Sequence, residues 1–413
     1  MRTKVLGVSA NVVILGAVSF ITDLSSEMMK PLLPLFITGL GGGGLAIGLI
    51  GGLGDGFSSL LQVFSGYWSD RAPRRKPFVF AGYAVSSVFK LFLALSSAWQ
   101  HVLAALSLER VGKGLRTAPR DAIIADSTEQ SLRGRAFGLH RALDTGGAVA
   151  GSLAALLLFR FLGFELRSIL VVAAVVAFAA LFPLYWVRER PREPRKLPLA
   201  LTLRRLPGRF RLFLLAATAF GLANFTYMFF ILRARDFFIA GSSEREAMAA
   251  AIGLYIVYNV VYSLLALPMG ALSDRFGRGR VLIAGYFLFA ITCFGFALVD
   301  FWVLFLVLFG LYGVVYAIVE TTQRAFACDL ASGQSQGAAL GMLHTCTGIA
   351  TICGSLIAGQ LWEVVGAAAA FVYGGAVALL ATALLLALIV RSGGHAIRQP
   401  HLSCGNSQGH AAG

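Results

Sequence analysis

The chain has 413 residues, of which 57% are hydrophobic and only 13% are charged, and its formal net charge is +15. A soluble globular protein of this size would leave a large part of that apolar surface in water, so the composition excludes that class and indicates a protein embedded in lipid. The Lys and Arg residues fall in short runs beside apolar segments, which is typical of loops on the inner side of a membrane and excludes a nucleic-acid-binding protein.

Apolar runs of about 20 residues, separated by short polar segments, predict about twelve membrane-spanning helices. The first run lacks a cleavage site after a short apolar core, so we expect it to stay in the protein as a spanning helix. Pro31 and Pro34 are expected to bend or end that helix. In chain order the predicted spans are residues 8–38, 46–66, 77–97, 101–122, 136–160, 168–187, 211–234, 248–270, 281–299, 301–325, 338–362 and 368–390.

The loops between these spans alternate between basic and nearly uncharged. Cations gather near the N-terminus, in residues 71–76, at 133 and 135, in residues 188–211, in residues 275–280 and at Arg391. All of these segments fall on one side of the membrane. The positive-inside rule places that side in the cytoplasm, so both termini are expected to be cytoplasmic.

The Arg- and Pro-rich segment 188–210 interrupts the hydrophobic pattern near the middle of the chain. We expect it to be a basic cytoplasmic linker between an N-terminal six-helix half, residues 1–187, and a C-terminal six-helix half, residues 211–390. The segment 391–413, rich in Gly, Ser and His, is expected to be a disordered cytoplasmic tail.

The two halves carry the same charged turn. The first copy, Gly66–Lys76, reads GYWSDRAPRRK, and the second, Gly270–Arg280, reads GALSDRFGRGR, 204 positions later. At offsets of 203 or 204, Asp55 also matches Asn259, Arg141 matches His344 and Gly151 matches Gly354. A register kept over this length indicates an internal duplication. Parallel repeats of membrane helices place a substrate path at their interface, near the middle of the bilayer.

These features resemble the major facilitator superfamily of transporters over nearly the whole chain, up to about Arg391. The charged turn is similar to that family's signature G-x-x-x-D-R-x-x-R-R. The resemblance implies an all-α polytopic membrane protein with about twelve transmembrane helices in two pseudo-symmetric halves, working by alternating access. It also implies that the turns latch the gate, with Gly66, Asp70, Arg71, Arg74, Gly270, Asp274, Arg275 and Arg278 as candidates. The alternative is a basic turn that only fixes orientation.

Two further segments resemble family signatures and depart from them in part. Arg110–Gly114 is similar to R-x-x-Q-G, with Lys113 in place of Gln. Three glycines, at 138, 147 and 151, match the start of the antiporter signature G-x8-G-x3-G-P-x2-G-G, but Ser152 stands at the position of the proline. The match favours efflux, and close helix packing explains the same glycine spacing equally well.

Charged and polar side chains inside the predicted spans are candidates for proton coupling or substrate binding. A carboxyl group removed from water takes up a proton more readily, as proton-coupled transport requires. A cation inside a span is expensive unless it faces a cavity or a carboxylate. Because Asn259 replaces the equivalent of Asp55, we expect coupling in the first half and substrate hydrogen bonds in the second. The candidates are Asp23, Glu27, Asp55, Arg110, Arg141, Asp144, Asn259, Glu320, Arg324 and His344. The alternative is a static set of ion pairs.

The leading hypothesis is a monomeric secondary transporter of the bacterial cytoplasmic (inner) membrane that exports an amphiphilic or drug-like compound in exchange for protons. Its expected partners are therefore a small-molecule substrate, protons and the lipid bilayer. One alternative is uptake or exchange of an anionic metabolite, favoured by Arg110, Arg141 and Arg324 in one interior. Another is a membrane sensor with the same fold that does not transport. The sequence has no phosphate-binding loop, nucleophile motif or metal-spaced cluster, so we expect no enzyme activity, no cofactor and no metal site.

Overall fold

The computed structural model is almost entirely helical and describes residues 4–5, 8–128, 133–189, 207–331 and 336–391. Most of the predicted linker 188–210 and all of the predicted tail after 391 lie outside the described residues. Of Asp55, Gly66 and Asp70 the structure describes only the helical backbone.

The first half begins with two paired strands of two residues each and continues as helices. In chain order its elements are β1 (Lys4–Val5), β2 (Val8–Ser9), α1 (Ala10–Met29), α2 (Leu33–Gly39), α3 (Gly44–Arg71), α4 (Lys76–Ala94), α5 (Trp99–Asp126), α6 (Arg133–Leu156), the π-helical turn η2 (Leu157–Phe161), α7 (Leu166–Ala179) and α8 (Leu181–Leu184).

The described elements of the second half are all helices. Its elements are α9 (Gly208–Ala223), α10 (Met228–Phe238), α11 (Glu244–Phe276), α12 (Arg278–Leu298), α13 (Trp302–Leu330), α14 (Gln336–Val364) and α15 (Ala367–Arg391). Helices satisfy every backbone polar group within the segment, which lipid requires of a spanning chain.

The described helices make twelve crossings, because the pairs α1–α2, α6–η2, α7–α8 and α9–α10 each form one crossing. Ten helical stretches in the described part of the chain are long and apolar enough to span a membrane. The helices α3 and α5 are not among these ten, and the 28 residues of α5 carry many charges between Glu109 and Asp121. The prediction of about twelve spanning helices in two halves is confirmed.

The first crossing of each half is interrupted. In the first half α1 ends at Met29, just before Pro31, which has no backbone N–H to continue the helix. In the second half α9 ends at Ala223 and α10 begins at Met228, although no proline lies between them. The span predicted over residues 211–234 lies within this crossing, which runs from Gly208 to Phe238 and is interrupted after Ala223.

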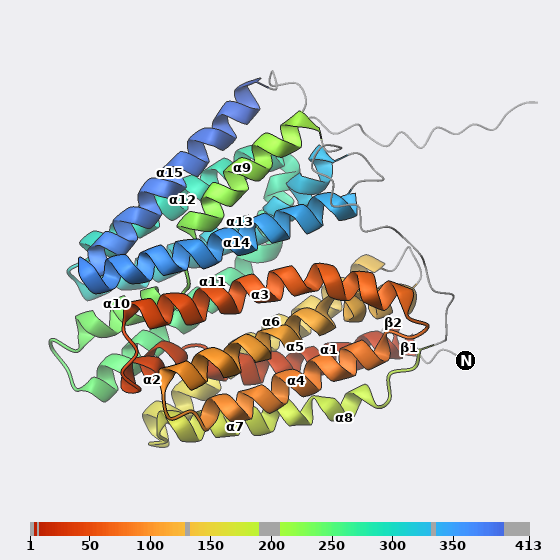
Figure 1. The fold of residues 1–413 in the computed structure, drawn as a ribbon, viewed down its shortest axis with the longest axis horizontal. Helices are drawn as coiled ribbons and strands as arrows, with labels where there is room; N and C mark the ends of the chain where they lie inside the picture. Colours follow the sequence, from red (N-terminus) through yellow and green to blue (C-terminus); the bar gives the residue numbers. More distant parts are fainter. Residues whose placement is uncertain (1–3, 6–7, 129–132, 190–206, 332–335, 392–413) are drawn as a thin grey trace, which may run out of the picture.

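The two halves meet tightly along α3 and α14. A β-carbon at Gly48 would lie 2.2 Å from the carbonyl oxygen of Ser355, and one at Gly44 would lie 2.7 Å from that of Gly359. Figure 1 shows the two helices diverging toward the end of the molecule that holds the N-terminus. We call this end, where the α3–α4 turn lies beside the chain after α8, the basic end. The halves therefore touch at the opposite end and separate toward the basic end.

The duplication is visible in the packing inside each half. A β-carbon at Gly151 on α6 would lie 2.3 Å from the carbonyl oxygen of Leu24 on α1. The repeat-equivalent Gly354 on α14 stands in the same relation to Leu222 on α9, at 2.1 Å. Glycine is therefore required at both positions by close helix contact. Within the antiporter-like spacing, packing explains Gly151, and likewise Gly147, whose β-carbon would lie 2.3 Å from the carbonyl oxygen of Phe20, whereas a β-carbon at Gly138 would meet nothing within 4 Å.

Candidate functional site

α1 and α6 bring two carboxyl groups together inside the first half. One oxygen of Asp144 accepts a hydrogen bond from the Ser19 hydroxyl at 2.7 Å, and the other accepts one from Arg141 at 3.1 Å. The carboxyl of Asp23 lies within hydrogen-bonding reach of the same Asp144. Two carboxyl groups form a hydrogen bond only when one of them carries a proton. Because Asp144 already accepts at both oxygens, Asp23 is the natural donor.

Glu27 lies one turn farther along α1 and connects the two halves. One oxygen of this buried carboxylate pairs with Lys30, which follows the last residue of α1. The other accepts hydrogen bonds from the Tyr255 hydroxyl at 2.9 Å and the Asn259 amide at 3.2 Å, both on α11. The Asn259 amide also donates to the Ser152 hydroxyl on α6 at 3.0 Å. A polar link thus joins α1, α6 and α11 in the middle of the molecule.

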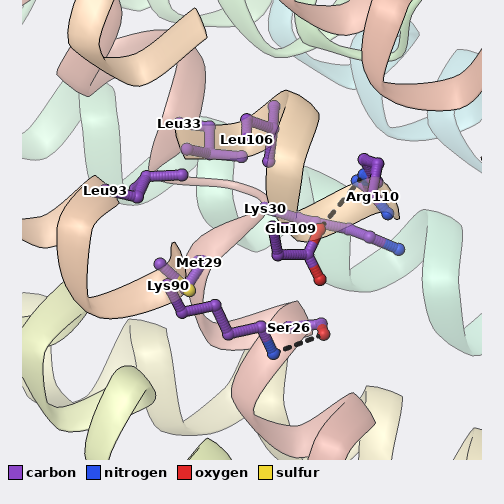
Figure 2. Close-up of a pocket in the computed structure, with 9 residues that line it drawn as sticks. All are labelled: Ser26, Met29, Lys30, Leu33, Lys90, Leu93, Leu106, Glu109 and Arg110. Atoms are coloured by element: carbon purple, nitrogen blue, oxygen red, sulfur yellow. Dashed lines mark hydrogen bonds and ion pairs between the residues drawn. The ribbon is translucent and has the colours of Figure 1, made fainter. Parts of the chain in front are cut away.

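A pocket opens beside Glu27, between α1, α2, α4 and α5 (Figure 2). Its polar wall is formed by Ser26, Lys30, Lys90, Glu109 and Arg110, and its apolar wall by Met29, Leu33, Leu93 and Leu106. Arg110 lies 3.5 Å from the Glu109 carboxylate, whereas Lys90 donates to the hydroxyls of Ser25 and Ser26 at 2.9 and 2.8 Å. The lining is therefore both charged and apolar.

The second half faces this region with tyrosines. Ring centroids lie 5.6 Å apart for Tyr227 and Tyr255, 5.5 Å for Tyr255 and Tyr258, and 4.8 Å for Tyr258 and Tyr312. Tyr227 also donates to the backbone carbonyl of Lys30 at 3.4 Å, so the aromatic cluster borders the pocket of the first half. Such a surface offers flat apolar faces together with hydroxyl groups.

A second charged group lies nearer the basic end. Arg141 donates to the Tyr262 hydroxyl on α11 at 2.5 Å, which makes another bond between the halves. On α13, Glu320 pairs with Arg324 and lies close enough to Arg141 and His344 to interact with both electrostatically. The side chains of Arg141 and Arg324 are each 57% exposed, so this group is open to its surroundings.

The structure places every predicted candidate whose side chain it describes in one of these groups, and Asp55 lies outside that description. Sequence reasoning missed Lys30 and Glu109. Both are charges within apolar runs, and each is close in sequence to a residue already chosen, so the criterion used for Glu27 and Arg110 would have included them. Tyr255 has no comparable signal, because an aromatic residue in an apolar span is ordinary.

The candidate latch residues of the second half bond within that half. Arg278 pairs with Asp274 at 3.1 Å and with Asp329 on α13 at 2.7 Å. In the first half Arg75 pairs with Asp126 at the end of α5, 203 positions before Asp329. Arg75, rather than the predicted Arg74, therefore makes the repeat-equivalent ion pair.

The arginines among the remaining latch candidates are exposed, with Arg71 and Arg74 at the α3–α4 turn and Arg275 at the end of α11. The Arg275 guanidinium lies over the neighbouring Phe276 ring at 5.5 Å, and a β-carbon at Gly270 would approach Thr321 only to 3.9 Å. Within the described residues no group of three or more His, Cys, Asp or Glu side chains is arranged to hold a metal ion.

Comparison with known proteins agrees with this architecture. A family model described as the Major Facilitator Superfamily matches residues 15–256 and 239–402. An MFS-type transporter of Methanocaldococcus jannaschii is 44% identical over 379 residues, which cover 92% of this chain and 94% of that protein. The multidrug resistance protein MdtH of Proteus mirabilis is 26% identical over 313 residues, covering 74% and 75%. The solved structure of the nucleoside transporter NupG has a TM-score of 0.77 at 14% identity, covering 92% and 99%.

Proposed function

The chain belongs to the Major Facilitator Superfamily of membrane transporters, and on that premise we propose that it exports an amphiphilic or drug-like compound in exchange for protons. The single observation that carries the proposal is the contact between the carboxyl groups of Asp23 and Asp144. A hydrogen bond between the two carboxyl groups requires a proton on one of them, and this proton would lie between α1 and α6 in the first half.

The proton at Asp23 is linked to the arrangement of the halves through Asp144 and Arg141. Arg141 binds Asp144 with one nitrogen and Tyr262 of the second half with another. Loss of the proton would put two negative carboxylates side by side, and such a pair repels unless a cation stays close. When the halves move and Arg141 leaves Tyr262, the cation beside the pair also shifts. Protonation and opening therefore depend on each other.

The state of the gate follows from the same contacts. By the positive-inside rule the basic end is cytoplasmic, and with it both termini, in the inner membrane. The glycine contacts of α3 with α14 close the opposite end, and the exposure of Arg141 and Arg324 favours an opening toward the cytoplasm. We infer a monomeric carrier in a cytoplasm-facing state, with its site between the halves.

The substrate class is supported by the lining. The tyrosines of α11 and α13 and the apolar wall of the pocket suit a compound with an aromatic or alkyl body. The name of the Proteus relative, a multidrug resistance protein, favours export. Uptake or exchange of an anionic metabolite is the second candidate, because Lys30, Lys90 and Arg110 all line the pocket.

The test uses inside-out membrane vesicles energised by respiration, in which a dye reports the acidity of the interior. Addition of compounds from a panel of amphiphilic drugs should release protons from wild-type vesicles. Asp23→Asn vesicles should show no release, because an amide cannot carry the proton. The control is Asp300→Asn, an exposed acid in the loop between α12 and α13.

Two results would contradict the proposal. Unchanged proton release from Asp23→Asn vesicles would remove Asp23 from the coupling mechanism. A wild-type protein that releases no protons with any compound of the panel would rule out proton-coupled export of this class.

A further inference from the structure

Among the described side chains around the pocket, one cation lacks a carboxylate partner. Glu27 pairs with Lys30, and Glu109 pairs with Arg110. Lys90 is left over: its ammonium donates to the hydroxyls of Ser25 and Ser26 and reaches the carbonyl oxygen of Thr22 at 3.5 Å. Among the described side chains no carboxylate lies within 4.0 Å of it. Of the five described side chains named here, Lys90 is the cation that has no carboxylate beside it.

This cation is far from water. Lys90 is only 2% exposed and lies in the interior of α4, within a predicted span. A cation in that position is expensive and is found where it meets a partner or serves a function. Hydroxyl and carbonyl dipoles offset part of the lost hydration, but they supply no opposite charge. A negatively charged ligand would complete the set.

The surroundings of Lys90 restrict the shape of such a ligand. Lys30 and Arg110 also line the pocket, so three cationic residues border it, at the end of α1, on α4 and on α5 (Figure 2). Leu33, Leu93 and Leu106 line the same space and would contact a hydrocarbon part. A positively charged drug would meet three like charges there, which is unfavourable inside a membrane protein.

The tyrosine cluster lies next to this pocket. Tyr227 binds the carbonyl of Lys30, and Tyr255 binds Glu27, so both rings border the cationic wall. A ligand with its acidic group at Lys90 would have room for its apolar body along the leucines and toward these rings. Charged and aromatic contacts on opposite halves would then be made by one molecule.

We propose that Lys90, together with Lys30 and Arg110, binds the acidic group of the transported compound, and that the substrate is therefore an amphiphilic anion with a carboxylate, phosphonate or sulfonate group. This inference rests on the proposed transport function and narrows its substrate class. The buried ammonium of Lys90 is the group that distinguishes an acid from a neutral compound of the same shape.

The experiment measures binding to the purified full-length protein in lipid nanodiscs at pH 7 by calorimetry. The probes are 4-phenylbutyrate, 3-(1-naphthyl)propionate and 2-phenylethylphosphonate, and for each carboxylate also its neutral primary amide. Wild type should bind the acids roughly tenfold or more tightly than the amides, since the amide leaves the buried charge unpaired. Binding needs no proton gradient, so failure of proton coupling would leave this result unchanged.

Three variants locate the effect. Lys90→Gln should lose the preference for acids, and Lys90→Arg should keep most of it. Arg209→Gln, which removes an exposed cation at the start of α9, should behave as wild type. Amides that bind wild type as tightly as the acids, no binding of any acid, or a full preference in Lys90→Gln would each overturn the proposal. If Lys90→Gln does not fold, the ratio of acid to amide binding in wild type still decides.

Discussion

Substitution of Gly48 by Ala should hold the protein open at the end opposite the basic end. The added β-carbon would lie 2.2 Å from the carbonyl oxygen of Ser355, whereas ordinary contact begins at 3.4 Å. The difference of 1.2 Å has to come from separation of α3 and α14, because the obstacle is backbone rather than a side chain that can rotate. Overpacking of this kind typically costs about 1–3 kcal/mol.

That penalty applies only to the state in which α3 and α14 touch. A bias of about 1–3 kcal/mol shifts a two-state equilibrium roughly 5- to 150-fold, so the state open at that end should gain population by this factor. Transport should slow as well, since each cycle has to pass through the state that the substitution disfavours.

The assay is double electron–electron resonance between spin labels at Leu95 and Leu298, after replacement of the native cysteines. Both positions are exposed, at 59% and 80%, and they end α4 and α12 on the two sides of the contact. Gly48→Ala should give longer distances than wild type. Gly310→Ala is the control, since a β-carbon there would meet nothing within 4 Å. A distance distribution in Gly48→Ala that matches both wild type and the control would refute the reasoning.

The ion pairs yield two further predictions for thermal unfolding in nanodiscs. Glu27→Gln should lower the melting temperature, because it leaves Lys30 without a carboxylate. The double variant Glu27→Gln with Lys30→Gln should have a melting temperature closer to that of wild type. If the losses of the two single variants simply add up in the double variant, the two groups do not interact. Asp126→Asn should destabilise the protein more than Asp329→Asn. The reason is that its partner Arg75 has a side chain only 9% exposed, whereas the side chain of Arg278, the partner of Asp329, is 25% exposed. Exposed ion pairs contribute only about 0–1 kcal/mol. Equal losses for the two acids would contradict this ranking.

Much of the fold could be predicted because lipid imposes simple rules on a chain. Runs of apolar residues gave the crossings, and Pro31 marked the break after α1. The matching break between α9 and α10 has no proline, so its cause lies in packing and could not be read from Asn224 to Tyr227. The span at residues 101–122, now α5, was also predicted as an apolar run, although its charges make it the least apolar of the crossings.

The site was predicted as a set of residues rather than as an arrangement. Charges such as Asp23 and Asp144 stand out in apolar runs, but their contact joins helices far apart in the chain. The bond from Tyr255 to Glu27 crosses 228 positions, and no sequence pattern encodes it. Likewise the spacing of the repeated turn predicted that Arg74 is the equivalent of Arg278. In the structure Arg75, and not Arg74, makes the ion pair that corresponds to the one between Arg278 and Asp329. Such pairings depend on helix rotation, which spacing alone leaves open.

The polarity of α5 has a consequence for how the chain enters the membrane during synthesis. A charge at the centre of an inserting helix adds about 2.5–3.5 kcal/mol on the insertion scale, and α5 carries several, so it is unstable in lipid on its own. Its preceding neighbour α4 is apolar and fits it closely, with a β-carbon at Gly82 only 2.7 Å from the carbonyl oxygen of Gly112. Across the same contact Arg116 donates to the Ser86 hydroxyl. We therefore expect the two helices to leave the insertion channel as a hairpin, so that this contact forms before most of the chain has been translated.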